Sequence, residues 1–326
     1  PKPDYNLGVG SGTQGAQTGR MLIETEKVLV EKQPDWVFVY GDTNSALAGA
    51  LAAAKLHTPV AHVEAGLRSF DRGMPEEINR LVADQVSDLL FTPSEDGNEN
   101  LSNEGIPAEK VHFVGNVMID TLVSALAQED RLHRAGPEEA AGLLDQLDGR
   151  PYILVTLHRP SNVDDPPTLQ AILSALLEVS RQVPVIFPMH PRTRQRVQEL
   201  APLDQSEGLH ILNPCGYFDF LALMRKASVV VTDSGGIQEE TTYLGIPCLT
   251  VRPNTERPVT ITQGTNRLVA SRHGALVSAI QDALRQGAQD ETRQPPALWD
   301  GQAGQRIVDV FLRNHQAKSR IQLTGR

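Results

Sequence analysis

The stretch ASVVVTDSGGIQEE, residues 227–240, decides the fold class expected for this chain. Its β-branched run Val229–Val231 stands between small or polar residues, which is typical of a buried strand in a parallel sheet. Residues 232–236 then turn the chain, and a helix is expected from Ile237 to Leu244. A strand, a glycine-containing turn and a helix in this order are common in α/β folds.

The turn in this stretch has the composition of a phosphate-binding site. Gly235 and Gly236 let backbone N–H groups approach a ligand without a Cβ in the way. A helix N-terminus adds unpaired donors and a partial positive charge. We therefore expect Ser234, Gly235 and Gly236 to hold a phosphate or diphosphate. Glu240, one turn into the helix, is placed to hold a ribose hydroxyl pair. The open alternative is a turn capped by Ser234 or Asp233 that binds no ligand.

The overall composition limits the classes of partner. The 326 residues suffice for a large core and two domains. The formal net charge of −10 argues against nucleic-acid or membrane-surface binding, so neither partner is expected. No apolar run approaches the roughly 18 residues of a membrane span, and no signal peptide is recognisable, so a cytoplasmic protein is expected. Cys215 and Cys248 lack CxxC partners, which predicts reduced thiols rather than a disulfide or metal site.

A glycine motif near the N-terminus, Gly10-x-Gly12-x-x-Gly15 with Asp35 twenty residues later, matches the dinucleotide fingerprint. That site needs a buried strand before its turn, and residues 5–7, Tyr-Asn-Leu, make a poor one. We favour a loop that leads into a helix from about Thr18 to Glu31.

Strands and helices alternate along most of the chain, which indicates βαβ units and parallel sheets. We expect one Rossmann-like domain at residues 1–125 and a second at residues 150–300, with the link in the charged helical region near residues 120–150. A final helix is expected at about residues 303–316. The predicted strands are residues 36–40, 59–63, 89–91, 111–114, 152–156, 183–187, 229–231 and 246–251.

Polar residues recur just past the ends of these strands. In open parallel sheets, ligands bind outside the carboxyl ends of the strands. Two sheets that face each other across a cleft would gather such residues into one site. The residues concerned are Asp42, Glu64, His158, His190, Ser234 and Glu256.

Taken together, several motifs resemble those of the UDP-N-acetylglucosamine 2-epimerases of the bacterial, non-hydrolysing kind. The resemblance runs from Pro1 to beyond residue 310. It implies two Rossmann-like domains similar to GT-B glycosyltransferases, a cleft for a UDP-sugar, a homodimer, and a C-terminal helix that packs on the first domain. The motifs are Gly41-Asp42-Thr43, His62-Val63-Glu64-Ala65-Gly66-Leu67-Arg68, Pro75-Glu76-Glu77-x-Asn79-Arg80, His158-Arg159, Asp233-Ser234-Gly235-Gly236-Ile237-Gln238-Glu239-Glu240 and Thr255-Glu256-Arg257-Pro258.

The chain departs from the family pattern in two places. The family normally begins with a strand, a GTRPE motif and a lysine-bearing helix, all before the point that matches Pro1. We therefore expect the first strand unit of the first domain to be missing from this sequence. Pro160 also stands where many relatives carry an arginine that belongs to a regulatory site for a second UDP-N-acetylglucosamine (UDP-GlcNAc), which puts such regulation in doubt.

The reaction implied is the reversible inversion of C2 in UDP-GlcNAc, which gives UDP-N-acetylmannosamine (UDP-ManNAc). The C2 proton has no adjacent carbonyl, so anti elimination of UDP to a glycal, followed by re-addition, is the accessible route. This route needs carboxylates at the sugar for charge stabilisation and proton transfer. The resemblance implies that Asp42, Glu64 and Glu76 supply them. Packed together, they would raise one another's proton affinity.

The resemblance also assigns the remaining site residues. His158 would donate to a phosphate oxygen or protonate the leaving group, and Arg68 would orient the carboxylates. Four of the assigned residues have a structural alternative: a turn or cap residue for Asp42, a first-turn helix carboxylate for Glu76, and core residues for His158 and Phe220. The substrate-binding residues implied are Arg68, Arg159, His190, Phe220, Ser234, Gly235, Gly236, Glu240 and Arg257.

Neither a metal nor a nicotinamide cofactor is required, since the reaction has no net redox change. Three competing functions stay open. A hydrolysing epimerase would release UDP and free N-acetylmannosamine. A GT-B glycosyltransferase would use the nucleotide site without three carboxylates in the first domain. A catalytically inactive UDP-sugar sensor would bind without turnover.

Overall fold

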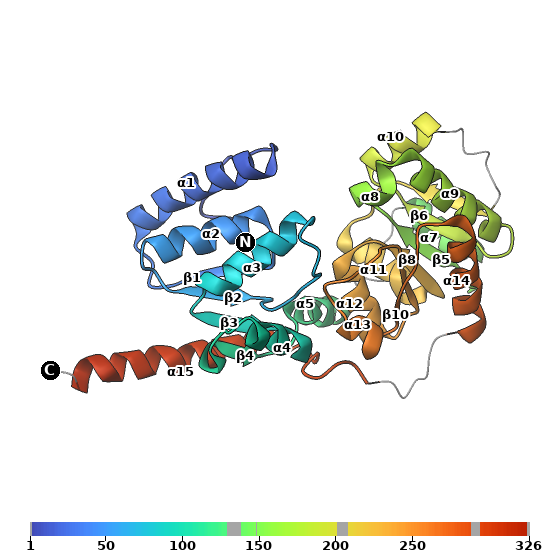
Figure 1. Cartoon of the computed structure of the whole chain (residues 1–326). Coiled ribbons are helices and arrows are strands. Elements are labelled where there is room, and N and C mark those ends of the chain that lie inside the picture. Colours follow the sequence, from blue (N-terminus) through green and yellow to red (C-terminus); the bar gives the residue numbers. More distant parts are fainter. Residues whose placement is uncertain (1, 129–137, 148, 201–207, 288–293, 325–326) are drawn as a thin grey trace. The chain divides into compact units, whose positions relative to one another are not determined.

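The computed structural model describes residues 2–128, 138–147, 149–200, 208–287 and 294–324. The chain divides into two units, which are described separately (Figure 1). Unit 1 comprises Pro1–Val117 and Ala297–Arg326, and unit 2 comprises Met118–Pro296. Each unit contains one parallel sheet with helices around it, so the predicted α/β class is confirmed.

The sheet of unit 1 has four parallel strands in the order β1-β2-β3-β4. Every residue of β2 and β3 is buried, as expected of strands covered on both faces. The strands are β1 (Val37–Tyr40), β2 (Val60–Val63), β3 (Leu89–Thr92) and β4 (Val111–Phe113). The helices are α1 (Gln14–Lys32), α2 (Asn44–Lys55), α3 (Pro75–Val86), α4 (Glu95–Asn103), the 3₁₀ turn η1 (Ala108–Lys110) and α15 (Ala303–Thr324).

The two faces of this sheet are covered by different helices. On one face, Val39 and Val60 pack against the alanines of α2 and against Ala83 of α3. On the other face, Ala61 and Val63 pack with α15. Phe311 of α15 lies edge-on to Trp36 and Phe38, with ring centroids 5.4 Å apart in both pairs.

Hydrogen bonds also tie the end of the chain to unit 1. The Trp299 indole donates to the Pro93 carbonyl at 2.9 Å, and Arg306 donates to the Val114 carbonyl at 3.1 Å. Gly115 has φ +89°, and a Cβ there would lie 2.1 Å from the Leu298 carbonyl oxygen. Only glycine allows this approach. Residues 297–314 therefore pack on unit 1, although they follow unit 2 in sequence.

The sheet of unit 2 has six parallel strands in the order β10-β9-β8-β5-β6-β7. The chain builds outward from β5 through β6 and β7, then returns to the other side of β5 with β8. The strand order therefore reverses between β5 and β8, which pair from Ile153↔Val229 to Thr156↔Thr232. The strands are β5 (Ile153–Thr156), β6 (Val185–Pro188), β7 (Leu209–Leu212), β8 (Val229–Thr232), β9 (Cys248–Thr250) and β10 (Asn266–Leu268).

The core of unit 2 joins the sheet to α9 and α14, whose apolar positions Leu169, Ile172, Leu276 and Ile280 are fully buried. Within the described residues, no helix is both long enough and apolar enough to cross a membrane. The helices of this unit are α5 (Val117–Leu126), α7 (Glu138–Leu147), α8 (Pro160–Val163), α9 (Pro166–Ser180), α10 (Pro191–Leu200), α11 (Tyr217–Lys226), α12 (Gly235–Leu244), α13 (Val259–Thr262) and α14 (His273–Gln286).

Three sequence expectations need correction. The first helix begins at Gln14 rather than Thr18, so Gly15 is helical, and residues 2–13 contain no strand. The glycine motif therefore lacks the strand that a dinucleotide site requires. Helix α12 begins at Gly235 rather than Ile237. Strands β7 and β10 were not anticipated from the sequence. Part of the expected link, residues 129–137 and 148, lies outside the described residues.

Candidate active site

In unit 1, Asp42 follows β1 and is held by α3. Arg80 of α3, only 1% exposed, forms an ion pair with the Asp42 carboxylate and a second with Glu77 at 2.9 Å. The Asn79 side-chain amide donates to the Asp42 carbonyl at 2.8 Å. Thr43, and not Asp42, accepts the capping hydrogen bond from Ala46 of α2 at 3.4 Å. The Asp42 carboxylate is therefore fixed on one side by Arg80 and partly exposed on the other.

Glu64 follows β2, the strand that pairs with β1. A Cβ built on Gly41 would be 3.3 Å from Glu64 Oε2, so the Glu64 carboxylate lies against the residue that precedes Asp42. Glu64 has φ +71°, an unusual conformation for a residue with a side chain. The N–H groups of Glu64 and Ala65 both donate to the Phe91 carbonyl, at 3.1 and 3.0 Å, which holds this conformation. Backbone strain of this kind costs about 1–3 kcal/mol and is concentrated at functional sites.

Glu76 and its neighbour Glu77 have different environments in the first turn of α3. Glu76 is half-exposed, where the helix dipole favours a negative charge. Glu77 is buried, and its carboxylate accepts the backbone N–H groups of Ser69 at 2.9 Å and Phe70 at 2.8 Å. These hydrogen bonds and Arg80 hold the pKa of Glu77 below its usual value, although burial alone would raise it. Glu77 thus anchors the loop before α3.

Arg68 does not point toward this carboxylate group. Its side chain is 1% exposed, and it pairs with Asp84 at 2.7 Å and with Glu104 at 2.7 Å. The cation that contacts Asp42 is Arg80, which lies in a motif noted in the sequence but was given no role there. Sequence spacing could have indicated its ion pair with Glu77, since Arg80 lies three residues after Glu77 on α3, but not its contact with Asp42.

In unit 2, Asp233 connects the two central strands where the strand order reverses. It follows β8, is fully buried, and accepts the backbone N–H groups of His158 at 3.1 Å and Arg159 at 2.9 Å. The Asn162 amide donates to the same carboxylate at 3.1 Å. Burial would raise the pKa of Asp233, but the hydrogen bonds from His158, Arg159 and Asn162 lower it. Ligands bind at such switch points in doubly wound sheets.

His158 is oriented by this carboxylate. Its Nδ1 lies 3.1 Å from Asp233 Oδ1, while 53% of the side chain is exposed. An ionised Asp233 favours the proton on Nδ1, so Nε2 is directed away from Asp233 toward solvent. Arg159 lies beside it and donates from Nε to the Asp233 carbonyl at 3.0 Å. His190, exposed after β6, accepts the Arg192 N–H on Nδ1 at 3.3 Å.

The two glycines at the start of α12 have different surroundings. A Cβ on Gly235 would lie 2.6 Å from Arg257 Nη1 and 2.9 Å from Glu256 Oε1, so a side chain there would displace the ends of these two ion-paired side chains. A Cβ on Gly236 would lie 3.6 Å from Met118 Cε, an ordinary contact. Ser234 makes no side-chain cap, so it does not compete for the donors of the first turn. The Ser234-cap alternative is thereby wrong.

Arg257 places a positive charge beside these donors. Its guanidinium pairs with Glu256 and, at 2.9 Å, with Glu239, and 11% of the side chain is exposed. Arg252 pairs with Glu256 at 2.8 Å. Burial would raise the pKa of Glu256, but Arg257 and Arg252 lower it to about 2. The helix N-terminus and Arg257 together form a setting suited to an anion.

Glu240 is 4% exposed and accepts a hydrogen bond from the Tyr217 hydroxyl at 2.9 Å. Its burial outweighs this hydrogen bond and raises the pKa of the Glu240 carboxyl. Tyr217 and the half-buried Phe220 both belong to α11. The sequence analysis missed Tyr217, although it lies three residues before Phe220, which was predicted to bind substrate.

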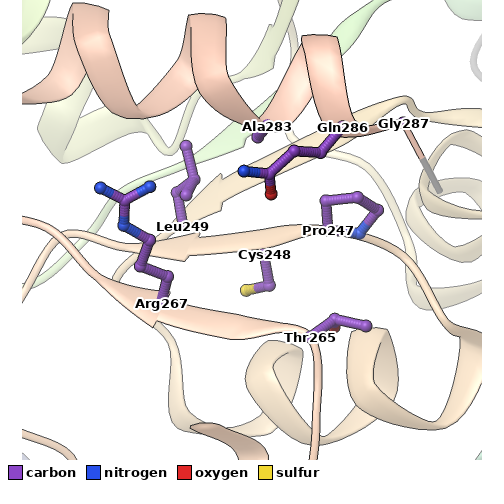
Figure 2. Close-up of a pocket in the computed structure, with 8 residues that line it drawn as sticks. All are labelled: Pro247, Cys248, Leu249, Thr265, Arg267, Ala283, Gln286 and Gly287. Atoms are coloured by element: carbon purple, nitrogen blue, oxygen red, sulfur yellow. The ribbon is translucent and has the colours of Figure 1, made fainter. Parts of the chain in front are cut away.

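A small cavity of about 60 Å³ lies away from this region. Figure 2 shows it between the beginnings of β9 and β10 and the end of α14, with Cys248 and Gln286 in its lining. Since ligands bind at the carboxyl ends of parallel strands, this edge is not where a nucleotide is expected. Over the described part of the chain, no three His, Cys, Asp or Glu side chains are grouped as metal ligands.

Comparison with known proteins identifies the family. The family model of UDP-N-acetylglucosamine 2-epimerase matches residues 1–312. The UDP-N-acetylglucosamine 2-epimerase of Methanocaldococcus jannaschii is 43% identical over 316 residues, 95% of this chain and 84% of that protein. A Pseudomonas aeruginosa protein, UDP-2,3-diacetamido-2,3-dideoxy-D-glucuronate 2-epimerase, is 45% identical over 314 residues, again 95% and 84% of the two chains.

Solved structures give the same result. The M. jannaschii UDP-GlcNAc 2-epimerase in complex with UDP-GlcNAc and UDP is 43% identical, covers 96% of this chain and 85% of its own, and superposes with a TM-score of 0.82. The fold of two parallel-sheet domains is therefore GT-B-like. This chain belongs to the UDP-N-acetylglucosamine 2-epimerase family.

Proposed function

We propose that this protein interconverts UDP-GlcNAc and UDP-ManNAc by anti elimination of UDP and re-addition to a glycal. The observation that carries the proposal is the pair of carboxylates Asp42 and Glu64, which lie at the ends of adjacent strands in a chain of the 2-epimerase family. One residue is fixed by Arg80 and the other by two backbone hydrogen bonds. Such preorganisation suits groups that stabilise charge and transfer protons.

We assign the sugar chemistry to unit 1. Elimination leaves positive charge at C1 of the sugar as the bond to UDP breaks, and a carboxylate nearby stabilises it. A second carboxylate removes the C2 proton, and protonation from the opposite face during return inverts the centre. Asp42, Glu64 and Glu76 supply these groups in our account. We include Glu76 in this set of carboxylates because it is half-exposed on the same helix as Arg80.

We assign the nucleotide to unit 2. Ser234, Gly235 and Gly236 at the start of α12 offer N–H donors to the diphosphate, and Arg257 adds charge beside Gly235. His158, oriented by Asp233, presents Nε2 to a phosphate oxygen or to the departing UDP.

The remaining nucleotide contacts follow from α11, α12 and the strand ends of unit 2. Glu240 would hold the ribose, and Phe220 on α11 would meet the uracil. Arg159 and His190 complete the set, since Arg159 follows β5 and His190 follows β6. We also infer a homodimer and a cytoplasmic location, in line with the family resemblance.

A second substrate is favoured by a specific observation. The P. aeruginosa relative, named for a 2,3-diacetamido uronic acid, is as similar to this chain as the M. jannaschii relative is. Its named reaction also inverts C2 of a UDP-sugar, so the same carboxylates would serve. The two substrates differ at C3 and C6 and not at the reacting carbon.

Product analysis tests the proposal. The purified protein is incubated with UDP-GlcNAc and, separately, with UDP-2,3-diacetamido-2,3-dideoxyglucuronate, and the products are separated and identified by NMR. We expect UDP-ManNAc from the first, with UDP still attached, and the same equilibrium mixture from UDP-ManNAc. Free UDP with free N-acetylmannosamine would indicate a hydrolysing enzyme. Transfer of the sugar to an acceptor would indicate a glycosyltransferase, and binding without turnover would indicate a sensor.

A further inference from the structure

His62, in the centre of unit 1, contacts a hydrogen-bond acceptor at each ring nitrogen. Its side chain is fully buried on β2. Nδ1 lies 2.6 Å from Asp84 Oδ1, and Nε2 lies 2.9 Å from the Gly41 carbonyl oxygen. A carbonyl oxygen only accepts hydrogen bonds, so Nε2 must carry a proton.

The state of Asp84 decides where the other proton lies. Asp84 is fully buried in α3, and its Oδ2 accepts the Gly66 N–H at 3.1 Å and pairs with Arg68 at 2.7 Å. Burial would raise the pKa of Asp84, but His62 and Arg68 hold it below its usual range. An ionised Asp84 has no proton to donate, so Nδ1 carries one as well.

The surroundings of His62 favour its charged form. Burial would lower the pKa of His62, but Asp84, the Gly41 carbonyl and Glu64 raise it. Its register partners on β1 and β3 are the uncharged Val39 and Leu90. The Arg68 charge, which would oppose protonation of His62, is paired with Asp84 and shared with Glu104. The two cations, His62 and Arg68, are thus balanced by two carboxylates, the buried Asp84 and the partly exposed Glu104. Buried ions require such charge balance.

This buried group connects the two turns that carry the proposed catalytic carboxylates. His62 donates to Gly41, the residue immediately before Asp42. Asp84 accepts from Gly66, two residues after Glu64. Gly41 N–H also donates to the Val63 carbonyl at 3.0 Å, which closes the link between the strand ends. A shift of either turn would move a carboxylate relative to the sugar.

We propose that His62 is a permanent imidazolium and that, with Asp84, it acts as a positioning pair for Asp42 and Glu64. Neither residue is proposed to touch substrate. The catalytic half of this inference rests on the proposed function, whereas the charge state does not.

The charge state is measured directly by NMR. At about pH 8.5, some two pH units above the ordinary histidine pKa, exposed imidazoles are neutral. In long-range ¹H–¹⁵N spectra of the ¹⁵N-histidine protein, we expect one of the nine histidines to keep both ring nitrogens protonated. The His62→Gln spectrum, which lacks that signal, assigns it. A neutral His62 at this pH would overturn the inference, whatever reaction the enzyme catalyses.

A pair of variants tests the positioning role. The side-chain amide nitrogen of glutamine can occupy the Nε2 position and donate to Gly41, whereas that of asparagine reaches only the Nδ1 position, toward Asp84. We expect His62→Asn to lose about 10²-fold in kcat, the effect of misplacing a reacting group by about 1 Å, and His62→Gln to lose roughly tenfold less. KM and UDP affinity should stay within about twofold of the parent in both variants.

The outcomes separate positioning from plain stability. Two folded variants with the parent's kcat would contradict the positioning role, and so would equal losses in both. If the parent itself fails to epimerise any UDP-sugar, the proposed function fails, while the NMR result still decides the charge state. Asp84→Asn is a further check, because it should abolish the protonated signal at about pH 8.5 by removing the charge that stabilises it.

Discussion

At the scale of single residues, the geometry of the site is set by the ion-pair and hydrogen-bond partners of each charged side chain. Asp42 and Glu64 are anchored by different means, Asp42 through Arg80 and Glu64 through its strained backbone. The carboxylate of Glu77, adjacent to Glu76, accepts hydrogen bonds from the backbone of the loop before α3. Two neighbouring glutamates therefore have separate tasks, and only the half-exposed one is available to a substrate.

Asp42→Asn, Glu64→Gln and Glu76→Gln should each reduce kcat by about 10²-fold or more, the range for acid–base and charge-stabilising groups. UDP affinity, measured by calorimetry, should change little, because the proposed nucleotide-binding residues belong to unit 2. Glu109→Gln, at an exposed carboxylate in η1, is the matched control and should keep the parent's kcat. If all three variants turn over like the control, the catalytic assignment is wrong.

Much of the site at this scale could be predicted from motifs, and part could not. The motifs give Asp42, Glu64 and His158 because residues just after strands must appear at the sheet edge. The motifs do not show which residue a given side chain will pair with in the folded protein. Arg68 turns to Asp84 and Glu104, and Arg80 meets Asp42, because the orientation of α3 decides which guanidinium reaches which carboxylate. Tyr217 was missed since its contact with Glu240, 23 residues later, depends on how α11 and α12 pack, which motifs do not show.

At the scale of elements, the strand–turn–helix of residues 229–244 brings its donors to the switch point of the second sheet. The sequence predicted this unit and misjudged where the helix begins, because both glycines adopt helical geometry despite their low propensity. Arg257 and Glu256 occupy the space beside Gly235 where a side chain would lie, which explains why a glycine stands at the start of this helix. Strands β7 and β10 escaped prediction because LHIL and NRL are short and not fully buried.

The two glycines give a matched pair of variants. Gly236→Val should leave the fold intact, since a Cβ there meets only Met118 at 3.6 Å, and should weaken UDP binding by obstructing the helix N-terminus. Gly235→Ala should instead lower the unfolding temperature, because its Cβ would collide with Arg257 and Glu256. Circular dichroism and calorimetry separate the two effects. Unchanged UDP affinity in folded Gly236→Val would contradict the assignment of the diphosphate to the N-terminus of α12.

At the scale of the whole molecule, buried charge makes stability depend on pH. The folded-state pKa of Glu256 is about 2, lowered from 4.5 by Arg257 and Arg252 against the effect of burial. A lowered folded pKa stabilises the protein above the unfolded pKa, and this stabilisation is lost as pH falls through the folded value. Glu256 should therefore contribute fully above about pH 4.5 and progressively less toward about pH 2.

Urea unfolding of the parent and of Glu256→Gln checks this contribution. The variant removes the Glu256 carboxylate from Arg252 and Arg257, while Arg257 keeps its ion pair with Glu239. Breaking a buried ion pair in this way costs of order 3–5 kcal/mol at neutral pH. The difference between the two proteins should shrink as pH is lowered, because protonation of Glu256 makes the parent resemble the variant. A difference that stays constant down to about pH 2.5 would contradict the lowered pKa.

The central claim, elimination and re-addition, is tested most directly by the hydrogen at C2. Elimination must break the C2–H bond, and a carboxylate base exchanges its proton with solvent. In heavy water, we predict deuterium at C2 in both UDP-GlcNAc and UDP-ManNAc recovered at equilibrium, with UDP still attached. Retention of the original hydrogen at C2 in every product would contradict the account.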